Sequence, residues 1–152
     1  MPKRPAHDFV GCFAGATATA ALAPDGLPAF FRALETASGG IGGVWGSRIP
    51  DSLEPATRGP NHRAFAHSLV AGASSVIAAR AHARQGQAFC RARAAQAVSG
   101  ALEHSPGCPT RLWLQLVGFF FTILAGLLAG VAAGFISHLV LDGLTPAGLP
   151  FL

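Results

Sequence analysis

Apolar and small residues dominate four stretches of this chain, and polar or proline-rich segments separate them. The stretches are residues 9–23, residues 28–49, a third that starts near Asn61 and runs to the arginines that begin at Arg80, and the long run 112–141. The second opens with the helical pattern "PAFFRALETA", and Asn61 behind Pro60 is a good N-cap for the third. The pattern predicts an all-α fold.

The fourth stretch is long enough to cross a membrane. No residue between Arg111 and Asp142 carries a formal charge. A bilayer core about 30 Å thick needs about 20 helical residues, which this stretch exceeds. Charged residues are 12% of the chain and hydrophobic residues 51%, a balance typical of membrane proteins. A buried helix of a soluble protein is the alternative, but no other part of the chain is large enough to bury it.

An arginine-rich connection lies between the third and fourth stretches. It carries Arg80, Arg84, Arg91 and Arg93 and ends at "SPGCP", where proline and glycine stop a helix. We predict a polar helix that lies on the membrane surface. The fold class is therefore an integral membrane helical bundle of about four helices plus an Arg-rich connecting helix, in a single domain over residues 1–152.

Glycines are concentrated at the end of the second stretch, in "SGGIGGVWGS". Gly39 and Gly43, and likewise Gly42 and Gly46, form GxxxG pairs. Such pairs let helix backbones approach closely in lipid. A flexible glycine-rich loop is the alternative interpretation.

The basic charge of the chain favours lipid over nucleic acid as a partner. The net charge is +4, but ten of the eleven basic residues are arginines scattered among alanine and glycine, and the chain has no tyrosine. Nucleic-acid binding would need a basic patch interleaved with aromatic side chains. Attraction to anionic membrane lipid is the better explanation.

Residues that can bind metals gather at one end of the predicted bundle if its helices alternate in direction. That end collects His7 with Asp8, Asp51 with Glu54, the segment 62–68, and His138 with Asp142, and so holds four of the six histidines. Helical bundles build their metal sites from such inward-facing groups.

The sequence "SHLVLD" places His138 and Asp142 four residues apart. On a helix this spacing separates them by about 40° around the axis, so both can face one ion. A carboxylate and an imidazole beside an apolar span are costly unless they serve a function. A histidine at a helix end with its own salt bridge is the simpler alternative.

The sequence "NHRAFAHS" offers the matching half of a site. His67 is the better ligand, whereas His62, about 140° away on a helix, is either a second ligand or a group that moves a proton. Arg63 presents a positive fork suited to phosphate or carboxylate. The loop "IPDSLEPATRGPN" adds Asp51 and Glu54.

Such a mixed nitrogen and oxygen set suits Zn²⁺, with Mn²⁺ as the alternative, and His7 would add another nitrogen. A capped turn with solvated acids remains the alternative for the loop.

The order of these elements resembles the YdjM-like family of membrane-bound, metal-dependent hydrolases. The resemblance rests on an early His, a Pro-Asp loop, the "NHRAFAHS" element and the late "SHLVLDGLTPAG" element, and it covers nearly the whole chain. By that match the family-type positions are His7, Asp51, Glu54, His62, Arg63, His67, Ser68, His138 and Asp142. Many relatives carry a second Asp where this chain has Leu53, which affects the expected number of metals.

The resemblance implies a multi-pass, metal-dependent hydrolase of a bacterial or archaeal cell membrane. The His-x-x-x-Asp spacing on a helix is also similar to that of the zinc-dependent phospholipase C and nuclease group, and this similarity implies hydrolysis of a phosphoester of a lipid or small molecule by a metal-activated water. The metal ligands would be His7, Asp51, His67, His138 and Asp142. Arg63 would steady the phosphate, and Glu54 or His62 would transfer the proton. The alternative function is a non-catalytic membrane interaction protein with a structural metal site, and a small metal carrier ranks behind both.

Overall fold

The computed structural model describes residues 4–53 and 69–144, and this part of the chain consists of helices and turns. Its four helices are α1 (Arg4–Ala21), α2 (Ala29–Leu53), α3 (Leu69–Leu102) and α4 (Pro109–Gly143). The predicted all-α fold class is confirmed for these residues.

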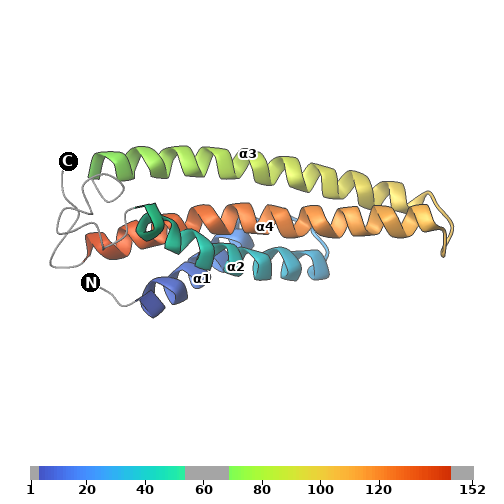
Figure 1. Cartoon of the computed structure of the whole chain (residues 1–152). Coiled ribbons are helices and arrows are strands. Elements are labelled where there is room, and N and C mark those ends of the chain that lie inside the picture. The colour runs from blue at the N-terminus through green and yellow to red at the C-terminus, as the bar shows by residue number, and fades with distance from the viewer. Residues whose placement is uncertain (1–3, 54–68, 145–152) are drawn as a thin grey trace.

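The four helices alternate in direction around α4. Helix α4 contacts each of the other three, and α1 also packs on α2. The start of α1, the end of α2, the start of α3 and the end of α4 lie toward the same end of the bundle (Figure 1). Helices α3 and α4 form a long hairpin that extends past the shorter α1 and α2 at the opposite end (Figure 1). The predicted alternation is therefore confirmed for the described helices.

The arginine-rich connection is not the separate surface helix that the sequence predicted. It is the second half of α3, a helix of 34 residues that packs along α4. The stretch 69–102 has no proline and is rich in alanine, arginine and glutamine, which are strong helix formers. The helix ends only at the turn before α4, where Gly107 adopts a φ of 86°.

Close glycine contacts hold α2 between α1 and α4. A Cβ added at Gly43 would overlap the backbone of Gly11 in α1, and one added at Gly134 of α4 would overlap the backbone of Gly43. One turn away, a Cβ at Gly130 would overlap the backbone of Gly39. The glycine-rich segment is thus a helix with closely packed neighbours, as the GxxxG interpretation predicted, and not a flexible loop.

Asp51 lies on a helix and not in the proline-rich loop that the sequence predicted. Helix α2 continues through Pro50 to Leu53. Pro50 is fully buried, and the packing of its ring offsets the backbone hydrogen bond that a proline removes from a helix. Asp51 is therefore held in the last turn of α2.

Of the four described helices, α4 is the one that is long and apolar enough to cross a membrane, judged by length and composition. Large apolar side chains are exposed along it and on the two short helices. They include Phe9, Phe13, Phe30, Trp45, Leu112, Trp113, Leu116, Phe120 and Val140.

The glycine contacts predict that Gly43→Ala destabilises the bundle. The new methyl group would overlap backbone atoms of α1, and overpacking of this kind costs about 1–3 kcal/mol of unfolding free energy. Gly100→Ala is the matched control, because its Cβ would meet only Leu114 Cδ1, at 3.5 Å. It should stabilise α3 by up to about 1 kcal/mol. Denaturant unfolding in detergent measures both, and equal effects would contradict the packing.

Cys108, the N-cap residue of α4, is predicted to be the most reactive of the three thiols at neutral pH. The nearby backbone N–H groups of Thr110 and then of Arg111 stabilise the thiolate and lower the pKa of Cys108 below its ordinary value. A lower pKa leaves more thiolate at a given pH, so alkylation should rise at a lower pH than for an ordinary thiol. Iodoacetamide labelling resolved by peptide mass spectrometry measures this. A midpoint at or above about 8.5 would contradict it.

Candidate metal centre

Two histidines and an aspartate meet in the interior at the end of the bundle. His7 comes from the second turn of α1, and His138 and Asp142 come from the last two turns of α4. Their exposed fractions are 6%, 1% and 2%. One potential ligand atom from each lies within 4.8 Å of the other two, so the cluster could hold a metal ion.

Asp142 faces both imidazole rings. Its Oδ1 lies 3.5 Å from His7 Nε2, and its Oδ2 lies 3.5 Å from His138 Nε2. The two rings are stacked, with centroids 4.1 Å apart and planes inclined by 28°. The spacing of four residues does place His138 and Asp142 on one face of α4, as the sequence predicted.

These nitrogen–oxygen separations are longer than good hydrogen bonds and are compatible with a shared ion. A good N–H···O hydrogen bond spans about 2.7–3.2 Å, and 3.5 Å is longer. In a tetrahedral zinc site with bonds of about 2.0–2.2 Å, two ligand atoms lie about 3.4 Å apart. Two imidazole nitrogens and a carboxylate are also a donor set that zinc accepts.

Asp51 extends the cluster toward the surface. Its Oδ1 is 3.5 Å from His138 Nε2, and its side chain is 55% exposed. The buried core of the centre therefore has a more exposed carboxylate beside it, contributed by α2.

An ion pair next to the cluster ties α1 to α2. Arg48 donates from Nε to Asp8 Oδ1 at 2.9 Å and from Nη2 to Asp8 Oδ2 at 2.7 Å. Asp8 follows His7, and Arg48 precedes Asp51 by about one helical turn. This two-pronged contact therefore fixes the relative position of two elements that carry cluster residues. The sequence analysis placed Asp8 at this end but did not identify Arg48 as its partner.

The structure brings together four of the eight residues to which the sequence analysis gave a role as metal ligand or catalytic group. His7, Asp51, His138 and Asp142 converge from three helices. Glu54, His62, Arg63 and His67 lie outside the described residues, and the roles assigned to them stay predictions.

A second buried polar cluster was not predicted. Glu35 of α2 is 2% exposed, and it accepts hydrogen bonds from Gln87 Nε2 at 3.0 Å and Arg91 Nε at 2.9 Å. Arg91 Nη2 is also 2.7 Å from Glu35 Oε1. The single acid in the first half of α2 was the available signal, because a buried carboxylate needs a cationic partner. The partner stands 56 positions away in the chain.

Comparisons with protein families, with curated proteins and with solved structures find no match to this chain.

Removal of either cluster residue on α4 should abolish metal binding. We expect about one Zn²⁺ per chain in detergent-purified protein. His138→Ala and Asp142→Asn should each weaken binding more than about 100-fold, since even the loss of groups that merely orient a ligand costs about 10–100-fold. His82→Ala is the control, because His82 lies exposed on α3 with its Nδ1 3.0 Å from Ala78 O. Elemental analysis after dialysis against zinc measures occupancy, and unchanged occupancy in His138→Ala would contradict the site.

Proposed function

We propose that this chain is a membrane-bound, metal-dependent hydrolase that cleaves a phosphoester. The observation that carries the proposal is the buried cluster of His7, His138 and Asp142, whose potential ligand atoms lie within 4.8 Å of one another. The order of motifs that resembles the YdjM-like family supports the same function.

In this proposal the protein is a multi-pass bundle in the bilayer, with α4 as its central span. The exposed apolar side chains on α1, α2 and α4 support a lipid environment. So do the glycine contacts between helix backbones, which replace the hydrophobic driving force that is absent in lipid. The internal pairing of Glu35 with Arg91 lowers the cost of placing those charges there.

His7, His138 and Asp142 would hold the ion, and Asp51 would be the more exposed fourth ligand, with His67 as a further candidate. A bound Zn²⁺, or Mn²⁺ as the alternative, would lower the pKa of a water and polarise a phosphoryl oxygen. Arg63 would orient the phosphate by two-pronged hydrogen bonding. Glu54 or His62 would accept and return the proton.

Hydrolysis of a chromogenic phosphodiester by the zinc-loaded protein tests the function. We expect turnover in the native protein and, in either Glu54→Gln or His62→Gln, a loss of at least about 100-fold in kcat with metal content unchanged, because general base catalysis contributes about 10²–10⁴-fold. Glu103→Gln is the control, since Glu103 is exposed in the turn between α3 and α4. Turnover that survives His138→Ala would contradict the proposal.

A structural metal in a non-catalytic interaction protein is the second candidate. The burial of all three cluster residues to 6% exposure or less favours it, because a structural site is closed. In that case the native protein would keep its metal, lose stability on chelation and hydrolyse no phosphoester.

A further inference from the structure

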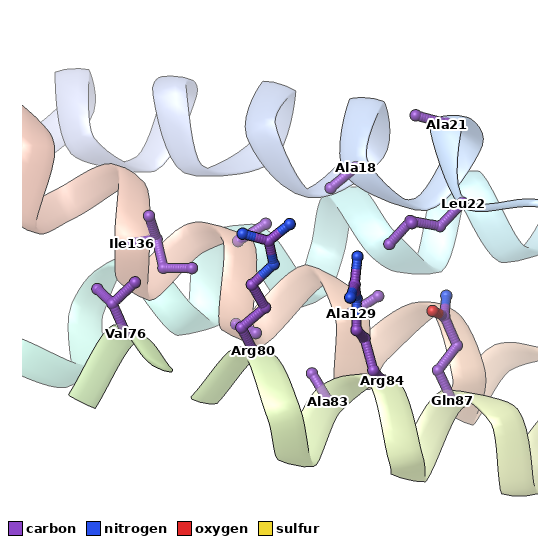
Figure 2. Close-up of a pocket in the computed structure, with 12 residues that line it drawn as sticks. Ala18, Ala21, Leu22, Val76, Arg80, Ala83, Arg84, Gln87, Ala129 and Ile136 are labelled. Carbon is purple, nitrogen blue, oxygen red and sulfur yellow. The ribbon is translucent and has the colours of Figure 1, made fainter. Parts of the chain in front are cut away.

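A cavity of about 320 Å³ lies between the end of α1, the first half of α3 and the second half of α4. Alanines of all three helices form much of its wall, among them Ala18, Ala83 and Ala133. The side chains of Arg80 and Arg84 extend from α3 toward α1 across this space (Figure 2). The result is an apolar groove with two guanidinium groups in it.

The two arginines belong to a polar stripe along one face of α3. Arg80, Arg84, Gln87 and Arg91 occupy positions i, i+4, i+7 and i+11, which fall within about 60° of the helix circumference. Gln87 also lines the groove. The stripe is therefore continuous from the groove to the buried Glu35.

The two halves of the stripe differ in their counter-charges. Arg91 and Gln87 both donate to Glu35. Among the residues that the structure describes, no carboxylate forms an ion pair with Arg80 or Arg84. A guanidinium beside an apolar wall is stabilised by an anion that accepts its hydrogen bonds. Glu35 of α2 supplies a negative charge to Arg91 further along α3. Within the described part of the chain, the two groove arginines have no such carboxylate.

The groove lies in the second half of α4, about 5 Å inside the hydrocarbon boundary of a bilayer centred on this helix. It is lined by α4 residues from Ala129 to Ile136, and the middle of α4 is Gly126. In a bilayer centred there, Ala133 lies about 10 Å from the centre, and the hydrocarbon boundary lies at about 15 Å. Long arginine side chains reach over such a difference to the headgroup level.

We propose that this groove binds an anionic phospholipid. Arg80 and Arg84 pair with the phosphate of its headgroup, and an acyl chain lies along the alanine wall. The apolar wall favours a lipid over free phosphate, which would leave the wall exposed to water. The inference rests on the membrane location in the proposed function, but on neither the metal nor the hydrolysis.

Native mass spectrometry of delipidated protein with added phosphatidylglycerol tests the site, with phosphatidylcholine as the comparison lipid. We expect Arg84→Gln to weaken phosphatidylglycerol binding about fivefold and the Arg80→Gln, Arg84→Gln double variant about thirtyfold. Phosphatidylcholine binding should change little. The matched control is Arg93→Gln, which removes the same charge from α3 at a guanidinium that lies 5.3 Å from the centre of the Phe89 ring.

Ala133→Phe gives a second test, because it fills the groove without changing any charge. It should also reduce phosphatidylglycerol binding in protein that keeps the native melting temperature.

Equal losses in Arg93→Gln and Arg84→Gln would mean diffuse attraction and would overturn the site. Displacement of the lipid by millimolar inorganic phosphate would overturn the choice of a lipid, and a dimer that Ala133→Phe dissociates would assign the groove to a second copy.

The same measurement on His138→Ala separates this inference from the proposed hydrolase. Lipid binding that persists in that variant supports the groove whether or not the native protein turns over a phosphoester. Lipid binding that disappears with the histidine would overturn an independent lipid site.

Discussion

The close approach of three helix backbones is the constraint on which the arrangement of this protein depends. Gly39 and Gly43 of α2 leave no space for a side chain between α2 and its neighbours α1 and α4. Contacts this close fix the axial position of each helix, because a shift along the axis would bring side chains against backbone. The start of α1, the end of α2 and the end of α4 therefore meet at a defined level. His7, Asp51, His138 and Asp142 come together there as a result.

The bundle handles its buried charges in two ways. Glu35 of α2 has its cationic partner, Arg91 of α3, inside the protein. This ion pair neutralises the buried charge and also links α3 to α2. At the other cluster two imidazoles face one carboxylate at 3.5 Å, an arrangement that could hold a divalent cation. Both clusters follow from one rule, that a buried ionisable group must find a partner of opposite charge.

The sequence predicts those parts of the fold that depend on local spacing. The i, i+4 relation of His138 to Asp142 lies within α4, and the GxxxG spacing lies within α2. Each is a property of a single helix, so the sequence alone specifies it. His7 was placed correctly because alternating helices return to the same end. Pro50 misled the prediction for Asp51, since local rules treat proline as a helix breaker and cannot register that the ring is buried. The partners of Glu35 and Asp8 stand 56 and 40 positions away, which no local pattern specifies.

Helix α4 contributes residues to both the groove and the candidate metal centre. Ile136 lines the groove, and His138 follows two residues later on the same rigid helix. Ala133 and Asp142 are separated by nine residues, or about 14 Å along the axis. The groove and the cluster are therefore about two and a half helical turns apart on the same helix. A lipid bound in the groove would contact the helix that carries two of the three cluster residues. Among the described residues of this group, Asp51 is the one whose side chain is exposed, because the end of α2 lies closer to the surface than the buried ends of α1 and α4 that carry the other three.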